Sequence, residues 1–138
     1  MTKKLNKVLL IDDDRPTNFF HEMIIRKMDC ADSIESFRGV DEAIAYLKLN
    51  SNKEAQFPEL IFLDINMPGL DGWDFIEAYK KIDSPYKEHT KIIVLTTSLS
   101  PREKQKAKEI PEILDFKNKP LDQELMKEVL EGYFQVVN

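Results

Sequence analysis

The chain contains 138 residues, of which 33% are charged and 42% hydrophobic, and its formal net charge is -5 with a pI near 5.1. A chain of this length forms one ordinary domain around a single core, and it contains no run of about 18 apolar residues that could span a membrane. The negative charge argues against nucleic acid as a direct partner, because binding to phosphate backbones requires a basic surface.

The N-terminal part of the chain predicts a strand followed by a helix. Residues 7–11 form an apolar, branched run that is typical of a buried strand, and three aspartates follow it directly. Pro16 suits the first turn of a helix, which we predict over residues 16–28. The helical spacing forms an apolar stripe from Phe19, Phe20, Met23, Ile24 and Lys27.

Two further strands are predicted before the middle of the chain. Residues 31–37 alternate apolar and polar side chains, as a partly exposed edge strand does. Asp41 begins a helix that we predict over residues 41–49, before a polar loop over residues 50–56. Four apolar residues then lead into Asp64, and the proline and glycine of the following turn end the strand. Asp64 is therefore predicted at the carboxyl end of a buried strand, which is the edge where open α/β sheets bind ligands.

The second half of the chain continues the alternation. One of its strands ends in hydroxyl side chains, at the position where two earlier strands end in acids. The predicted elements of this half are a helix over residues 71–81, a loop over 83–90, a strand over 91–97, a helix over 100–109, a strand over 113–116 and a helix over 121–134. Five strands and five helices in alternation predict a parallel sheet with helices on both faces.

The ends of the predicted strands bring polar residues to one edge of this sheet. These residues are Asp12, Asp13, Asp64, Thr96 and Lys119. Carboxylates that lie close together repel one another unless a cation is present, and Mg²⁺ prefers such oxygen ligands. An ammonium group and a hydroxyl beside a nucleophilic carboxylate would hold the oxygens of a phosphoryl group. The sequence therefore predicts a magnesium site that accepts a phosphoryl group.

Two features bear on the cellular compartment. The apolar run after the basic N-terminus is too short for a signal peptide, because three aspartates end it. The lone cysteine, Cys30, cannot form an internal disulfide, and we interpret it as a buried structural thiol. We therefore predict a cytoplasmic protein.

The motifs at the strand ends resemble those of the receiver domains of two-component response regulators, over almost the whole chain. They are Asp12-Asp13 after an apolar strand, Asp64 in Leu-Asp-Ile-Asn-Met-Pro-Gly, Thr96 in Val-Leu-Thr-Thr-Ser, and Lys119-Pro120. Their separations of 51, 32 and 23 residues, counted from Asp13, are typical of that family. The resemblance implies a flavodoxin-like, doubly wound (βα)5 fold with a five-stranded parallel sheet of order 2-1-3-4-5. Residues 1–138 would then form a single receiver domain without an output domain.

The resemblance also implies a phosphoacceptor and a metal site. Asp64 would be the residue that becomes phosphorylated. The carboxylates of Asp13 and Asp64 and the backbone carbonyl of Asn66 would bind Mg²⁺, and Asp12 would assist mainly through a water molecule. Mn²⁺ or Ca²⁺ could substitute for Mg²⁺.

Other matched positions would hold the phosphoryl group and transmit its arrival. Thr96 and Lys119 would hold phosphoryl oxygens, and Thr96 would move toward them while Phe116 turns inward. Asn66 and Ser98 occupy positions where receivers tune the lifetime of the phosphoryl group by admitting or blocking water. Phe116 lacks the hydroxyl that some family members have here, so apolar packing would favour its inward position.

The implied partners are proteins. The phosphoryl donor would be a histidine kinase or a histidine phosphotransfer protein, and the chain would not be an enzyme beyond its own phosphorylation and autodephosphorylation. The surface of the fourth helix, fifth strand and fifth helix would signal to an unknown protein target. We expect a monomer or weak dimer, without nucleic acid or a membrane as a partner.

Two other functions compete with this interpretation. A small Mg²⁺-dependent phosphatase with an aspartyl nucleophile would need an acid two residues after its nucleophile on the first strand, a spacing that Asp12 and Asp14 share. A receiver-like interaction domain that is never phosphorylated is disfavoured, because the acidic, threonine and lysine positions are all present.

Several residues have plainer interpretations. We predict that Asp14 is a turn or cap residue and that the Lys119-Pro120 bond is cis, as in the family. His21 and His89 have no partners at metal-ligand or catalytic spacing, so we assign them to the surface or to helix packing.

Overall fold

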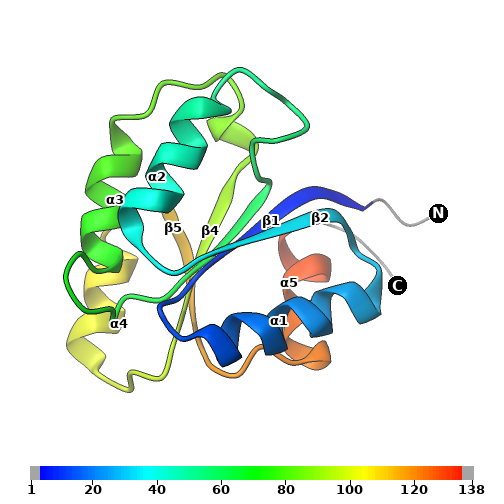
Figure 1. Ribbon diagram of the computed structural model, residues 1–138. Helices are drawn as coiled ribbons and strands as arrows, with labels where there is room; N and C mark the ends of the chain where they lie inside the picture. The colour runs from blue at the N-terminus through cyan, green and yellow to red at the C-terminus, as the bar shows by residue number, and fades with distance from the viewer. Residues whose placement is uncertain (1–3, 135–138) are drawn as a thin grey trace.

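A single sheet of five parallel strands forms the centre of the protein (Figure 1), whose computed structural model describes residues 4–134. The strand order is β2-β1-β3-β4-β5, which confirms the predicted order. The bounds are β1 Leu5–Ile11, β2 Ala31–Phe37, β3 Leu60–Leu63, β4 Lys91–Thr96 and β5 Ile113–Asn118. All neighbouring strands are parallel, so their carboxyl ends lie at one edge.

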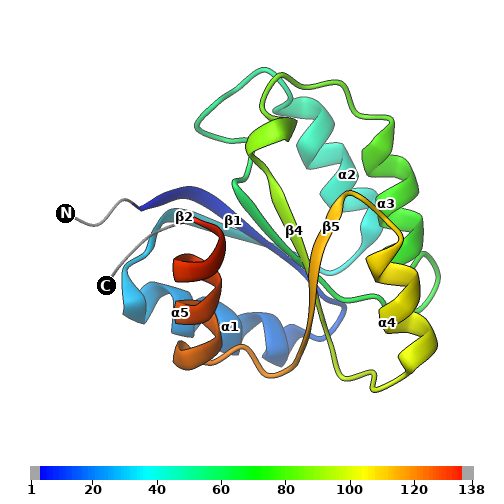
Figure 2. The same cartoon turned by 180° about the vertical axis from the view of Figure 1, so that it is seen from behind.

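Among the described residues, four α-helices connect the strands and a fifth follows β5, and together they cover both faces of the sheet, as predicted (Figure 1 and Figure 2). Their bounds are α1 Arg15–Met28, α2 Val40–Leu49, α3 Gly72–Lys80, α4 Pro101–Lys108 and α5 Gln123–Tyr133. Helices α1 and α5 lie on one face, and α2, α3 and α4 lie on the other. Within the described residues, none of these helices is both long and apolar enough to cross a membrane.

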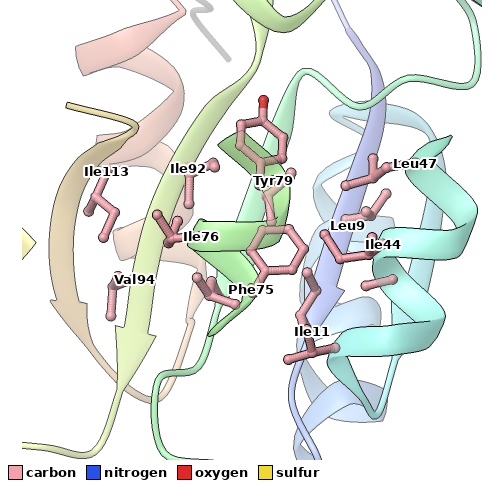
Figure 3. Packing of buried hydrophobic residues seen from close by; sticks show 14 of the residues in the cluster. Leu9, Ile11, Ile44, Leu47, Phe75, Ile76, Tyr79, Ile92, Val94 and Ile113 are labelled. Carbon is pink, nitrogen blue, oxygen red and sulfur yellow. The ribbon is translucent and has the colours of Figure 1, made fainter. Parts of the chain in front are cut away.

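Each face of the sheet packs against its helices in a separate apolar core. Strand β1 contributes to both cores, because successive side chains of a strand point to opposite faces. Leu9 and Ile11 pack with the α2–α4 side, and Val8 and Leu10 pack with the α1 and α5 side. Figure 3 shows Phe75 of α3 over the sheet in the first of these cores. This two-sided burial explains why the strands are continuous apolar runs in the sequence.

Most predicted elements are confirmed with shifted ends. Strand β4 ends at Thr96, one residue before the predicted end, and β5 continues beyond Phe116 to Asn118. The loop predicted over residues 83–90 contains a short 3₁₀ helix, Lys87–His89. Cys30 is buried and the Lys119-Pro120 bond is cis, as predicted.

The predicted apolar stripe of α1 is wrong as a core-facing surface. Phe19, Phe20 and Met23 are 66%, 44% and 51% exposed. The buried face of the helix consists of Asn18, His21 and Ile25. Polar side chains can occupy a buried face when hydrogen-bond partners meet them there, and those partners come from distant parts of the chain that helical spacing does not reveal.

Candidate functional site

Asp64 follows β3 directly, between the carboxyl ends of β1 and β4. Its backbone N–H donates to the carbonyl of Ile11 at 2.9 Å, which joins it to the end of β1. The carboxylate is buried, and it accepts from the backbone N–H of Asn66 at 3.1 Å and from the Lys119 ammonium at 3.1 Å. The flanking strands therefore fix the position of the acid in the sheet.

Three carboxylates meet at this edge, as predicted. Asp12, Asp13 and Asp64 each place one oxygen within 4.8 Å of the others. Asp12 is buried and accepts from the backbone N–H of Asp14 at 2.9 Å, whereas Asp13 is half-buried. Carboxylate oxygens in this number and proximity suit a hard divalent cation such as Mg²⁺.

Asp14 does not belong to this cluster of carboxylates and instead caps a helix. Its side chain accepts from the backbone N–H of Thr17 at 3.1 Å and forms the N-cap of α1. The prediction of a cap residue is therefore confirmed, and the cap fixes where α1 begins.

Lys119 extends from the end of β5 into the acid cluster. Its ammonium pairs with Asp12 and, at 3.1 Å, with Asp64. Its backbone N–H donates to the carbonyl of Thr96 at 2.9 Å, which holds the residue beside the end of β4. One cation is thus shared between two buried carboxylates.

Lys119 and Asp12 form a buried pair in which the pKa of each group is raised. Burial lowers the pKa of Lys119, but the hydrogen bond and charge of Asp12 and the charge of Asp64 outweigh this effect and raise it above its usual value. Burial raises the pKa of Asp12, and the hydrogen bond from Lys119 opposes this rise. The cluster therefore favours additional positive charge.

Thr96 ends β4 beside the acids with a fully buried side chain. Its hydroxyl oxygen accepts from the backbone N–H of Ser98 at 3.2 Å and from the side-chain amide of Asn66 at 3.3 Å. Asn66 itself is exposed. A hydrogen bond thus connects the loop after Asp64 to the end of the neighbouring strand.

Ser98 and Phe116 are the two remaining residues for which the sequence predicted a role in the site. The hydroxyl of Ser98 is hydrogen-bonded to Glu103 of α4 and accepts from the backbone N–H of Ser100 at 3.2 Å. Phe116 lies opposite Val94 in the sheet and packs half-buried against the core on the α2–α4 side. Ser98 thus connects the end of β4 to the start of α4.

Two buried residues beside the site were not singled out from the sequence for a role in it. The side-chain amide of Asn18 donates to the backbone carbonyl of Asp12 at 2.8 Å, and Nε2 of His21 accepts from the backbone N–H of Leu121 at 3.2 Å. His21 therefore has the helix-packing role, whereas His89 is exposed. The one sequence signal was their spacing with Ile25 at positions i, i+3 and i+7 of a helix.

Acid is expected to destabilise the fold through His21. Burial, and then the positive charge of Lys119, lower the pKa of this imidazole to about 4. Between its usual pKa near 6.5 and about 4, the unfolded chain binds a proton that the folded chain does not, so stability falls as the pH falls through this interval. Across the whole interval, the free energy of unfolding should fall by about 3 kcal/mol because of His21. Urea unfolding of wild type and His21→Gln should be compared between pH 6.5 and about pH 4, where the variant should lose about 3 kcal/mol less stability than wild type. Equal losses in the two proteins would contradict the lowered pKa of His21.

Comparison with known proteins gives a consistent result. The family described as the response regulator receiver domain matches residues 8–131. The crystal structure of a two-component response regulator from Cytophaga hutchinsonii is 32% identical, with a TM-score of 0.86, and the match covers 96% of this chain and 99% of that one. The chemotaxis response regulator CheY4 of Vibrio cholerae is 26% identical, with a TM-score of 0.73, and the match covers 95% of this chain and 98% of that one.

Two curated relatives are longer proteins. The hybrid signal transduction histidine kinase L of Dictyostelium discoideum is 28% identical over 132 residues, which cover 96% of this chain and 7% of that protein. The sensory transduction protein LytT of Bacillus subtilis (strain 168) is 25% identical over 130 residues, which cover 94% of this chain and 48% of that protein. The family match covers residues 8–131, and the sheet has the order β2-β1-β3-β4-β5 that the resemblance implied. The chain therefore belongs to the response regulator receiver domains of two-component signalling.

Proposed function

We propose that the chain accepts a phosphoryl group on Asp64 from a histidine kinase or a histidine phosphotransfer protein, and that the phosphorylated form signals through protein contacts. The observation that carries this proposal is the Lys119 ammonium shared between Asp12 and Asp64, with the buried Thr96 hydroxyl beside it. A fixed cation and a hydroxyl beside a nucleophilic carboxylate suit phosphoryl transfer, which depends on positioning and charge neutralisation.

In the proposed reaction, an oxygen of Asp64 forms a bond to phosphorus as the bond between phosphorus and the donor's imidazole nitrogen breaks. The electron pair of that bond stays on the nitrogen, and the product is an acyl phosphate. Lys119 now donates to Asp64, so its ammonium can donate to an oxygen of the incoming phosphoryl group from nearly the same position. Thr96 would exchange its contact with Asn66 for another phosphoryl oxygen.

Receiver domains bind Mg²⁺ at an acidic pocket, and the three clustered aspartates form such a pocket here. We assign Asp13, Asp64 and the backbone carbonyl of Asn66 as the ligands, with Asp12 assisting. When bound, the cation would supply charge neutralisation during phosphoryl transfer. The chain's own residues then orient the carboxylate of Asp64 and the ammonium of Lys119.

We propose that the phosphoryl donor docks on α1 and that the signal leaves through a different surface, formed by α4, β5 and α5. Exposed Phe19, Phe20 and Met23 form an apolar patch on α1, which begins beside the acid cluster, and this patch supports docking of a protein donor near Asp64. Ser98 is tied to Glu103 of α4, and Phe116 is half-buried on β5. The Ser98 contact with α4 and the half-buried position of Phe116 on β5 support a change at α4 and β5 after Thr96 moves.

Labelling of the purified chain tests the proposal. Incubation with acetyl phosphate and Mg²⁺ should add one phosphoryl group, measured by intact mass. An unchanged mass would contradict phosphoryl acceptance. A screen for hydrolysis of small phosphomonoesters addresses the competing phosphatase, whose second acid would be Asp14; that side chain caps α1 instead. Catalytic turnover in the screen would favour the phosphatase.

Magnesium is expected to stabilise the fold by relieving repulsion among the three carboxylates. At a concentration one hundred times its Kd, Mg²⁺ should add about 2.7 kcal/mol to the free energy of unfolding. Asp13→Asn should abolish most of this gain, because it removes one charged ligand, whereas Asp32→Asn, at an exposed position of the edge strand β2, should retain it. Denaturant titrations with Mg²⁺ and with EDTA measure the difference, and equal gains in both variants would exclude Asp13 as a ligand.

A further inference from the structure

Helix α1 buries two polar side chains on its sheet-facing side. Asn18 and His21 are 4% and 3% exposed, and Ile25 continues the same face one turn later. Buried polar groups destabilise a fold unless they are hydrogen-bonded, so their partners show what they do. Both partners are backbone groups of loops that carry site residues: the carbonyl of Asp12 and the N–H of Leu121.

The loop that carries Lys119 is attached on both sides of that residue. The backbone N–H of Lys119 donates to the carbonyl of Thr96 at 2.9 Å. Two residues later, the backbone N–H of Leu121 donates to Nε2 of His21 at 3.2 Å. Leu121 is fully buried, so its N–H needs an acceptor from the protein, and the imidazole of His21 provides it. The imidazole therefore fixes one point of the chain just after Lys119.

His21 can accept this hydrogen bond only as a neutral imidazole with its proton on Nδ1. Burial, followed by the charge of Lys119, lowers its pKa to about 4, which keeps the ring neutral near pH 7. Asn18 anchors the same helix to the Asp12 carbonyl at 2.8 Å. Helix α1 is thus hydrogen-bonded through buried side chains to both the loop of Asp12 and the loop of Lys119.

A small cavity shows that these side chains border the acid cluster directly. Its volume is about 10 Å³, and its polar lining comes from Asp12, Asn18, His21 and Asp64. Oδ1 of Asn18 has no hydrogen-bond partner among residues 4–134, and a cavity of this size has room for about one water molecule. The two α1 side chains thus lie immediately beneath the carboxylates that Lys119 joins.

We propose that His21 and Asn18 are positioning residues, which place the Lys119 ammonium between the carboxylates of Asp12 and Asp64. The role in phosphoryl transfer rests on the proposed function, whereas the placement of the ammonium does not. Neither side chain touches the phosphoryl group; Asn18 acts through the backbone carbonyl of Asp12, and His21 acts through the backbone N–H of Leu121, two residues after Lys119.

Phosphorylation rates with acetyl phosphate and Mg²⁺ test the role in transfer. His21→Leu, which removes the acceptor, should slow labelling about tenfold, whereas His21→Gln, whose side-chain oxygen can accept from Leu121, should stay within about twofold of wild type. Ile25→Val, on the same buried face, is the control for lost helix packing and should retain the wild-type rate. In a Lys119→Ala background, His21→Leu should have no further effect. A wild-type rate for His21→Leu, or an equal loss in both backgrounds, would overturn the proposal.

Asn18 has its own matched control. Asn50 is also a buried asparagine whose amide donates to a backbone carbonyl, that of Tyr46, but it ends α2 away from the acids. Asn18→Leu should slow labelling severalfold while Asn50→Leu does not, and equal rates in the two variants would remove Asn18 from the proposal.

An NMR measurement separates this inference from the proposed function. The resonance of the Lys119 ammonium, which senses its contacts with Asp12 and Asp64, should shift in His21→Leu and not in Ile25→Val. The wild-type spectrum should show His21 neutral and protonated on Nδ1. An unchanged Lys119 resonance, or a proton on Nε2, would overturn the placement whether or not Asp64 becomes phosphorylated. Failure of wild-type labelling with these NMR results intact would refute the proposed function alone.

Discussion

Asp64→Asn is expected to abolish phosphoryl labelling of the chain by acetyl phosphate. An amide oxygen is a far weaker nucleophile than a carboxylate, and the side chain keeps nearly the same size at the end of β3. Lys119 retains its pairing with Asp12, so its buried ammonium is not left without a counter-charge. The loss of labelling should therefore occur in a folded protein.

The experiment compares intact masses of wild type and variant after incubation with acetyl phosphate and Mg²⁺, with circular dichroism as a check of folding. Asp32→Asn, an exposed acid on the edge strand β2, is the matched control and should be labelled like wild type. Undiminished labelling of Asp64→Asn would mean that another group accepts the phosphoryl, and the assignment of Asp64 would be wrong.

Gly72→Ala is expected to be among the most destabilising single substitutions in the chain. A Cβ at this position would lie 2.6 Å from Cα of Ile65 and 2.8 Å from the carbonyl oxygen of Asp64. Both atoms belong to the backbone beside the phosphoacceptor, so the methyl group cannot be accommodated by rotating a side chain. We expect a loss of about 3 kcal/mol in the free energy of unfolding.

Gly132→Ala provides the control, because a Cβ there would have no atom within 4 Å. In α5 this substitution should stabilise the protein by about 0.5 to 1 kcal/mol, since alanine favours the helix. Urea unfolding of the two variants measures the contrast. Similar stability of Gly72→Ala and wild type would mean that α3 does not approach the backbone after β3 as closely as the structure shows.

The site was predictable to the extent that topology alone brings residues together. Asp12, Asp64 and Thr96 each stand at the end of an apolar run, and parallel strands end at the same edge whatever the details of packing. Asp14 was recognisable as a cap because helix starts follow local rules. The close approach of Gly72 to the backbone of Ile65, in contrast, could not be predicted from the sequence, because it depends on the angle at which α3 meets the sheet.

The buried face of α1 was decided by the tertiary structure. Helical spacing favoured Phe19, Phe20 and Met23 for the core, yet the helix turns these outward and buries Asn18 and His21. The partner of His21 is the N–H of Leu121, which lies 100 residues further along the chain, and no local pattern carries that information.

The amino-acid sequence by itself thus determined the alternation of strands and helices, and with it the sheet edge and the residues gathered there. These follow from local periodicity and from the shared direction of parallel strands. Only the tertiary structure decided which of these groups pair, as Lys119 does with Asp12 and Asp64, and which buried side chains of α1 contact the loops that carry them. Such contacts depend on hydrogen-bond partners and close approaches between segments that are distant in the chain.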